Sequence, residues 1–169
     1  EELKKNWSYY IEEAEQEEEV KEKLKKIIDE SRKLKVEDIK IIDPAMGSGH
    51  MLVYAFDLLY DIYLSEGYMA SEIPKLITEK NLYGLDIDER AFQLAYFALM
   101  MKGRSKSRRF FNEQVNVNLC AIKESNRLPR EAVEYLVNPE SLEIEKMLDR
   151  NDVEYLINVF HDAKEYGSI

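Results

Sequence analysis

A short loop that is rich in small residues and carries one acid is the part of this sequence best suited to binding a ligand. Residues 43–50 read Asp-Pro-Ala-Met-Gly-Ser-Gly-His and follow a short apolar, β-branched run at 39–42. Glycines at 47 and 49 let the backbone approach a ligand where a Cβ would clash. The N-terminus of a following helix presents free N–H groups and the positive end of the helix dipole. The segment therefore predicts a ligand-binding turn between a strand and a helix.

The chemistry of this loop narrows the choice of ligand. It contains no Gly-Lys-Ser/Thr, and its two glycines are spaced Gly-Ser-Gly, so neither a phosphate-binding P-loop nor a dinucleotide fingerprint is present. Asp43 would repel a pyrophosphate but could receive a cation. S-adenosylmethionine has a sulfonium and an amino group and no phosphate, so it suits the loop. A purely structural turn and another nucleotide-like ligand are the alternatives.

Asp86 is the second acid that could contact such a ligand. It ends a second strand candidate at 82–87. An acid at this point of a βαβ unit characteristically takes the ribose hydroxyls. The usual separation from the glycine loop is roughly 20 residues, and a predicted helix at 72–80 accounts for the longer spacing here. Asp88 is expected to cap the next helix. A capping or surface role is the alternative for Asp86.

The order of the predicted elements indicates an α/β fold with a parallel sheet. Strands are predicted at 39–42, 82–87 and 115–122. Helices are predicted at 49–65, at 72–80 with Ser71 as its cap, and from Asp88 to about Met101 with Gly103 as its stop. The aromatic residues of the helix at 49–65 are expected in the core: Tyr54, Phe56, Tyr60 and Tyr63.

Helical segments are predicted on both sides of this α/β part. Residues 8–38 read as one long charged helix capped by Ser8, either a solvated helix or an acidic arm that binds a partner. Further helices are predicted at 130–137, 140–148 and 152–165. The chain thus divides into an N-terminal helical arm at 1–38, a ligand-binding α/β half-domain at 39–125 and a C-terminal helical segment at 126–169.

The composition limits the partners of the chain. Its 169 residues carry a formal net charge of −10, which argues against this segment alone gripping a DNA backbone. One cysteine, Cys120, and two histidines make a zinc cluster implausible. With no signal peptide or membrane span visible, a cytoplasmic setting is expected. One dense basic cluster stands out, as a solvated loop or a phosphate contact: Lys102, Arg104, Lys106, Arg108 and Arg109.

Two motifs carry a family resemblance. Residues 43–50 resemble the cofactor-binding motif of N6-adenine DNA methyltransferases, although Met46 stands where that motif has cysteine. Residues 84–88, Gly-Leu-Asp-Ile-Asp, resemble the next motif of the family. Further segments resemble the adenine-specific methyltransferases of BREX phage-defence systems, namely 50–63, 73–74, 81–88, 95–102 and 162–167.

The resemblance implies a partial Rossmann-like S-adenosylmethionine-dependent methyltransferase core that holds strands one to three of a seven-stranded sheet. It implies methylation of adenine N6 in double-stranded DNA within a BREX or restriction-modification system. DNA would be bound through parts of the protein outside this chain. Asp86 would hold the ribose of the cofactor, Ile87 would pack on its adenine, and the loop would cradle its methionine end. The full predicted cofactor set is Asp43, Pro44, Ala45, Met46, Gly47, Ser48, Gly49, Asp86 and Ile87.

Two neighbouring residues have open roles. His50 is expected to pack in the first turn of its helix, with a catalytic base as the alternative. Glu124 is either an exposed acid or a marker of the adenine edge of the pocket.

The catalytic motif of this family, Asn/Asp-Pro-Pro-Tyr/Phe, is missing, because the sequence contains no Pro-Pro pair. The nearest text, Asn138-Pro139-Glu140, predicts a helix start. The chain is therefore expected to be an inactive fragment that exposes the edge of its first strand, and self-association is expected. A non-catalytic interaction module, or a fragment of an RNA or small-molecule methyltransferase, is the alternative.

Overall fold

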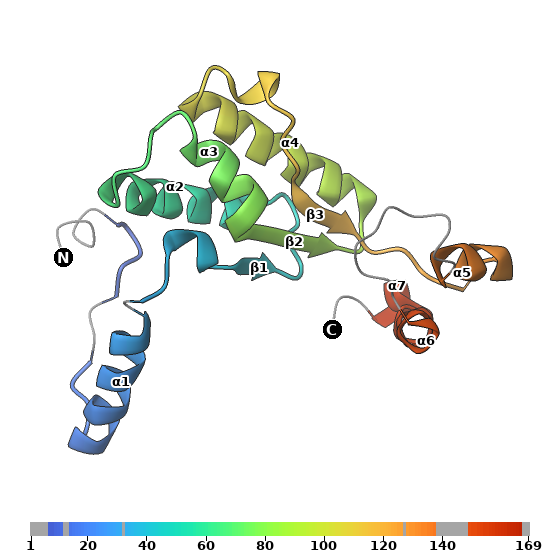
Figure 1. Cartoon of the computed structure of the whole chain (residues 1–169), viewed down its shortest axis with the longest axis horizontal. Coiled ribbons are helices and arrows are strands. Elements are labelled where there is room, and N and C mark those ends of the chain that lie inside the picture. The colour runs from blue at the N-terminus through green and yellow to red at the C-terminus, as the bar shows by residue number, and fades with distance from the viewer. Residues whose placement is uncertain (1–6, 12–13, 32, 127, 138–148, 167–169) are drawn as a thin grey trace.

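A three-stranded parallel sheet is the centre of the fold (Figure 1). The computed structural model describes residues 7–11, 14–31, 33–126, 128–137 and 149–166. The strands β1 (Ile41–Asp43), β2 (Leu82–Asp86) and β3 (Asn118–Ala121) lie in the order β1-β2-β3. β1 is thus an edge of the described sheet. The predicted α/β class and its parallel strands are confirmed, with shorter strands than expected.

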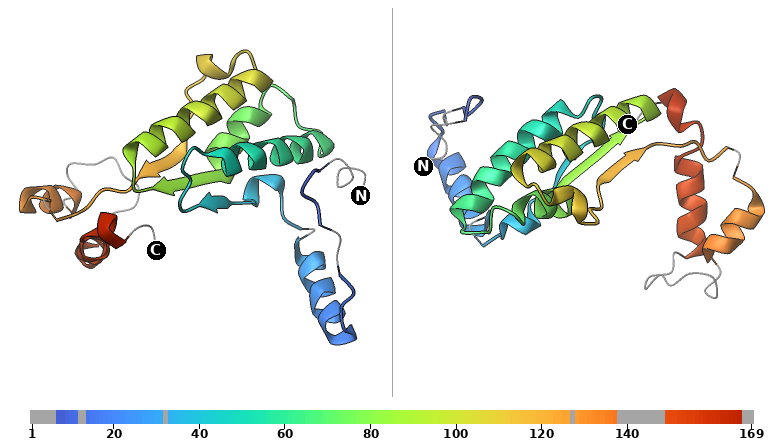
Figure 2. Two further views of the ribbon diagram at one scale, coloured as in Figure 1. Left: turned by 180° about the vertical axis from the view of Figure 1, so that it is seen from behind. Right: turned by 90° about the horizontal axis from the view of Figure 1, so that it is seen from above.

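Two long helices cover one face of this sheet (Figure 2). α2 (His50–Ser65) contacts β1 and β2, and α4 (Glu89–Lys106) contacts β2 and β3. Of the four aromatic residues of α2 predicted in the core, Phe56, Tyr60 and Tyr63 are buried, whereas Tyr54 is half-buried. The core lies between these helices and the sheet residues that face them, including Leu82 and the half-buried Ile41 and Leu119.

The connection between α2 and β2 differs from the predicted single helix at 72–80. A short α3 (Ile73–Leu76) passes into a π-helical turn at Ile77–Asn81. Glu72 occupies the N-cap, and its side chain makes no capping bond, so the predicted cap at Ser71 is wrong. At the end of the turn, the buried Asn81 donates from Nδ2 to the carbonyls of Val36 and Ile39, at 2.7 and 2.8 Å. The π-helical turn therefore fixes the chain where it enters β1.

α4 begins as predicted and ends later. Oδ1 of Asp88 accepts the N–H of Arg90 at 2.9 Å, which confirms the N-cap. Gly103 does not stop the helix, which continues to Lys106. Gly103 is buried against Phe110, and a Cβ there would lie 2.5 Å from the Phe110 ring. This glycine therefore permits close packing of the 3-10 turn at Phe110–Asn112 instead of ending the helix.

The N-terminal arm is only partly helical. The predicted helix at 8–38 is replaced by α1 (Glu18–Ser31) and a 3-10 turn at Val36–Asp38. Ser8 does not cap a helix, because it lies in a turn closed by a 3.1 Å bond from Tyr10 N–H to the Trp7 carbonyl. The Tyr9 ring packs edge-on against Tyr54 of α2, with centroids 5.1 Å apart, so this segment is held by the fold.

The C-terminal segment contains α5 (Arg130–Val137), as predicted, and two helices in place of one at 152–165. α6 (Arg150–Val159) and α7 (Ala163–Tyr166) are separated because Asp162 adopts a positive φ of 54°. The N–H of Asp162 donates to Oδ1 of Asn126 at 2.8 Å, which ties this corner to the chain after β3. The predicted helix at 140–148 lies outside the described residues.

None of the helices in the described part of the chain combines the length and apolar character needed to cross a membrane.

Candidate functional site

The two acids selected from the sequence meet at the carboxyl end of the sheet. Asp43 ends β1 and Asp86 ends β2, and these strands are parallel neighbours. The backbone N–H of Gly47 donates to Oδ2 of Asp86 at 2.8 Å. The structure thus brings the loop at 44–49 onto the end of β2, at the edge where open α/β sheets bind their ligands.

Backbone hydrogen bonds give this loop a defined shape. The N–H of Met46 donates to the carbonyl of Leu85 at 2.9 Å, and the N–H of Gly49 donates to the carbonyl of Met46 at 2.7 Å. Oδ1 of Asp43 accepts the N–H of Ala45 at 3.2 Å. The loop is therefore anchored on β2 at two successive residues, Met46 and Gly47.

The two loop glycines are needed for different reasons. Gly47 has φ +52°, and a Cβ there would meet nothing within 4 Å. Its conformation favours glycine, and the space beside it is open. Gly49 has φ +76°, and a Cβ there would lie 2.8 Å from the Cβ of Ala95. Gly49 therefore brings the start of α2 close to α4, while the side of Gly47 stays open.

Met46 points away from the open side of the loop. Its side chain is 2% exposed and belongs to the core cluster. A Cβ on Gly84 would lie 2.6 Å from its sulfur, so the missing side chain of Gly84 makes the space that Met46 fills. The extra volume of methionine, relative to the cysteine of the family motif, therefore enters the core and leaves the loop uncrowded.

Both carboxylate oxygens of Asp86 accept a hydrogen bond from a backbone N–H group. Oδ2 accepts the N–H of Gly47, and Oδ1 accepts the N–H of Asp88 at 2.9 Å. A carboxylate oxygen has two lone pairs, so each can accept a second hydrogen bond. Ile87, the next residue, is exposed, as are Ser48 and His50. Asp86 can thus both anchor the loop and receive a hydroxyl group.

A polar hollow of about 570 Å³ lies beyond β3 and includes Glu124. Its other lining residues are Lys123, Asn126 and Lys164. Lys123 Nζ lies 2.8 Å from Oε2 of Glu89, and this hydrogen bond lowers the pKa of Glu89. The N–H of Ile122 donates to the carbonyl of Asp86 at 2.7 Å, so the chain that leads into the hollow starts beside the site.

The basic cluster is not part of this site. It lies at the opposite end of α4 from Asp88 and continues into the loop that follows. Lys102 and Lys106 are 2.5 and 3.6 Å from the carboxylate of Asp57 in α2. Lys106 Nζ also lies 4.5 Å from the centre of the Tyr60 ring. These two lysines therefore link α4 to α2, whereas Arg108 and Arg109 are exposed.

Three residues that shape the site were not predicted. Leu85 accepts a loop hydrogen bond through its carbonyl, Gly84 makes room for Met46, and Ala95 is small enough to face Gly49. Gly84 carried a usable signal, because a glycine inside a strand often marks close approach of another group. Leu85 and Ala95 carried none, since a backbone carbonyl and an alanine in a helix have no distinctive pattern.

Comparison with known proteins shows the family to which this chain belongs. Residues 11–155 match the family model described as the MmeI DNA-methyltransferase domain. The chain is 50% identical over 117 residues to the adenine-specific methyltransferase PglX of Lacticaseibacillus casei. These residues make up 69% of this chain and 9% of that protein. It is 46% identical over 123 residues to the adenine-specific methyltransferase BrxX of Escherichia coli, covering 73% of this chain and 10% of that protein.

A third relative is more distant. It is a putative type II restriction enzyme and methyltransferase of Methanocaldococcus jannaschii, 38% identical over 72 residues, covering 39% of this chain and 6% of that protein. The chain thus spans about a tenth of the length of the first two relatives. The resemblance to N6-adenine methyltransferases, and to PglX among them, is confirmed, and the chain belongs to the family of the MmeI DNA-methyltransferase domain.

Proposed function

We propose that this chain binds S-adenosylmethionine between the loop at 43–49 and Asp86, as the cofactor-binding part of an adenine-specific DNA methyltransferase. The observation that carries the proposal is the pairing of a loop at the end of β1 with a carboxylate at the end of β2, joined by the 2.8 Å bond between Gly47 and Asp86. In α/β folds that bind dinucleotides, the loop after the first strand and the acid after the second strand contact neighbouring parts of one ligand.

The residues present fit this cofactor. The space beside Gly47 is open, because a Cβ there would meet nothing within 4 Å. Asp43 accepts the Ala45 N–H with Oδ1, and its carboxylate offers negative charge to a sulfonium or an ammonium group. The carboxylate of Asp43 would repel a phosphate group, which argues against a phosphate ligand. Asp86 can accept hydroxyl groups in addition to its two backbone bonds.

The proposal gives each residue a defined task. Asp43, Pro44, Ala45, Gly47, Ser48 and Gly49 would form the cradle for the methionine end, and Met46 would contribute its backbone alone. Asp86 would hold the ribose, and Ile87 would offer apolar surface to the adenine. When bound, the cofactor supplies an electrophilic methyl group.

The substrate is inferred from the relatives of this chain. We infer methylation of adenine N6 in double-stranded DNA, within a BREX or restriction-modification system, because the relatives are adenine-specific methyltransferases and the matching domain is a DNA methyltransferase. Contact with DNA would come from parts outside this chain, since its net charge is −10 and two of its clustered lysines pair with Asp57.

Isothermal titration calorimetry with S-adenosylmethionine tests the proposal. The 169-residue chain is expected to bind, and Gly47→Ala to weaken binding by about tenfold, equivalent to about 1.4 kcal/mol. Gly67→Ala is the matched control, because Gly67 also has a positive φ of 85° with nothing within 4 Å of a Cβ. It should leave the affinity unchanged. Absence of binding by a chain with a native circular dichroism spectrum would overturn the proposal and favour a non-catalytic interaction module.

A further inference from the structure

We propose that the chain self-associates by docking α1 of one copy onto the exposed face of α4 in a second copy. Each of the two helices carries an apolar stripe whose residues are exposed, by 38–60% on α1 and by 46–62% on α4. Their charges and lengths are complementary. The inference is independent of cofactor binding, since neither stripe includes a residue of the site proposed above.

The outer face of α4 carries an apolar stripe between two arginines. Leu94, Phe97 and Met101 recur at helical spacing and are 53%, 62% and 46% exposed. Arg90 and Arg104 lie two turns before and after Phe97 on the same helix. Large apolar side chains grouped in this way on a surface mark an interaction site more often than scattered ones do.

The stripe on α1 is of matching length. No residue of α1 is buried, and four apolar residues repeat along one face of the helix. They are Val20, Leu24, Ile27 and Ile28. At 1.5 Å per residue, this stripe and the stripe from Leu94 to Met101 each extend about 10–12 Å. One helix can therefore cover the other along its whole apolar length.

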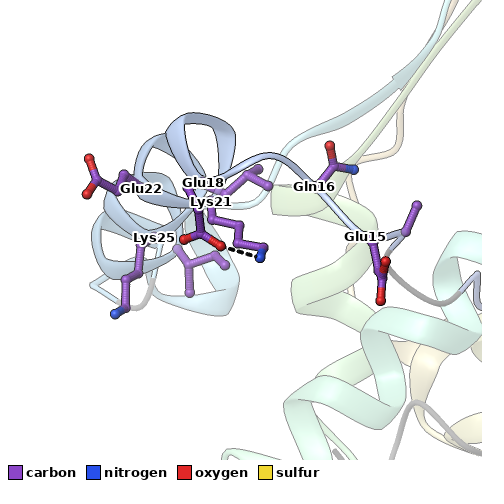
Figure 3. Close-up of a pocket in the computed structure, with 9 residues that line it drawn as sticks. Glu15, Gln16, Glu18, Lys21, Glu22 and Lys25 are labelled. Carbon is purple, nitrogen blue, oxygen red and sulfur yellow. Dashed lines mark hydrogen bonds and ion pairs between the residues drawn. The ribbon is translucent and has the colours of Figure 1, made fainter.

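A hollow beside α1 could receive a large side chain (Figure 3). It measures about 600 Å³ and is formed where the chain at 14–16 runs alongside the helix. Leu24 and Ile28 supply apolar surface, and the charged residues that line the hollow are Glu15, Glu18, Lys21, Glu22 and Lys25. Phe97 is the most exposed member of the α4 stripe, so we assign it to this hollow.

Charge selects an antiparallel arrangement of the two helices. The N-terminal end of α1 is acidic: Glu15 and Glu17 precede Glu18 and Glu19, which pair with Lys21 and Lys23 of the same helix at 2.7 Å each. The C-terminal end of α4 and the following turn are basic, with Arg104, Arg108 and Arg109. An antiparallel pair places these ends together, which also suits the two helix dipoles. A parallel pair would bring the acidic end of α1 to Glu89 and Arg90, where the charges of α4 are mixed.

The edge of β1 is a weaker surface for a second copy. β1 has only three residues and ends in the charged Asp43, and short, charged edge strands resist pairing. An apolar groove of about 490 Å³ does border this edge, lined in part by Ile42 and Met51. Edge pairing is therefore the alternative that the experiment must separate.

Sedimentation velocity of the 169-residue chain between 1 and 100 μM separates these outcomes. We expect the apparent mass to rise from 19.9 kDa toward twice that value. Phe97→Glu and Leu24→Glu should each raise the dissociation constant at least tenfold. Ile42→Lys, the matched control on the β1 edge, should leave it unchanged. A wild-type monomer at all concentrations, or dissociation caused by Ile42→Lys alone, would overturn the proposal.

A charge exchange provides the second readout. Replacing Arg104, Arg108 and Arg109 by Glu should weaken association. Replacing Glu15 and Glu17 by Lys in the same chain should restore it, and these changes keep the Glu18–Lys21 and Glu19–Lys23 ion pairs of α1. Recovery identifies the contact between the two named helices, because an edge-to-edge sheet would not respond. If the doubly exchanged chain stays as weak as the arginine variant, the assignment of α1 as the occupant is wrong.

Discussion

The N–H of Gly47 donates to the Asp86 carboxylate at 2.8 Å, so the loop after β1 is attached to the last residue of β2. The second carboxylate oxygen accepts the N–H of Asp88 at 2.9 Å. Asp86 thus holds the loop and the start of α4 in a fixed relation. A substitution here has a structural effect as well as any effect on ligand binding, and the two must be measured separately.

Asp86→Ala is expected to weaken binding of S-adenosylmethionine by roughly 10- to 100-fold, because hydrogen bonds to a charged group contribute about 1.5–3 kcal/mol. The same variant leaves two backbone N–H groups without their acceptor. We therefore also expect the free energy of unfolding to fall by about 1–3 kcal/mol. Calorimetry measures the first effect and urea denaturation the second.

Asp88→Ala is the control for Asp86→Ala. It removes the N-cap of α4, which should lower the free energy of unfolding by about 1 kcal/mol. The hydrogen bond from the Gly47 N–H to Oδ2 of Asp86 is kept. Its affinity for the cofactor should match that of the wild type. Equal affinities for the Asp86 variant and the wild type, in a folded chain, would limit Asp86 to its structural role.

Gly84→Ala is expected to destabilise the fold by about 1–3 kcal/mol through overpacking. The new Cβ would lie under 3.0 Å from Met46 Sδ, Leu119 Cδ2 and Leu52 Cδ1. Adding Met46→Ala removes the nearest of these atoms, so the double variant should be more stable than the sum of the single changes predicts. A thermodynamic cycle from urea denaturation measures this coupling. Strict additivity would show that Met46 does not fill the space above Gly84.

Sequence patterns predicted the fold best where periodicity was strong. The apolar α2 and the run at 82–87 were placed within one residue at each end, and Asp88 was placed as a cap correctly. The errors lie where a tertiary contact overrides a local signal. Gly103 reads as a helix stop, yet it lies inside α4 because Phe110 packs on it. The arm at 8–38 reads as one helix, yet Tyr9 contacts Tyr54 and Asn81 binds the carbonyls of Val36 and Ile39.

The candidate site was predictable in its acids and glycines but not in its interior. Asp43, Gly47 and Asp86 have chemistry that local spacing reveals. The direction of the Met46 side chain depends on Gly84 in another strand, and the close approach of Gly49 depends on Ala95 in another helix. Such pairs are distant in sequence, so a local pattern contains no information about them.

Asn81→Ala is expected to destabilise the chain by about 2–4 kcal/mol. Asn81 is fully buried, donates hydrogen bonds to two carbonyls and accepts one from the Tyr63 hydroxyl at 2.9 Å. Each buried polar group that loses its partner costs about 1–3 kcal/mol. Tyr63→Phe is the matched control, because it removes only the third of these bonds and should cost about 1 kcal/mol. Similar losses for both variants would mean that the entry to β1 is held by other contacts.

Acid sensitivity is expected to depend on Glu37. Its carboxylate forms an ion pair with Lys80 and accepts a hydrogen bond from the Tyr68 hydroxyl at 3.2 Å. The hydrogen bond from Lys80 is the main cause of the lowered pKa of Glu37. Because the pKa of Glu37 is lower in the folded state than in the unfolded state, the ionised carboxylate stabilises the fold. This stabilisation is complete above the unfolded pKa of about 4.3 and is lost as the pH falls through the pKa of the folded state. Glu37→Gln should therefore flatten the stability profile between about pH 5 and 3.

Lys80→Gln tests the cause of this dependence. It removes the partner and keeps the carboxylate, so the pKa of Glu37 should return toward its ordinary value and the profile should flatten in the same way. Thermal denaturation across this pH range measures both variants. A Lys80 variant with the wild-type acid profile would show that the ion pair does not cause it.

The chain alone is expected to show no methyl transfer to DNA. An enzyme that modifies an adenine amino group must hold the extruded base in a pocket that stacks on it and binds its edge. In this family the Asn/Asp-Pro-Pro-Tyr/Phe motif performs that task, and the sequence has no Pro-Pro pair. Tritiated S-adenosylmethionine and double-stranded DNA provide the assay, with a full-length PglX or BrxX relative as the positive control. Incorporation by the 169-residue chain above a no-enzyme blank, abolished by Asp86→Ala, would show that its own residues complete an active site.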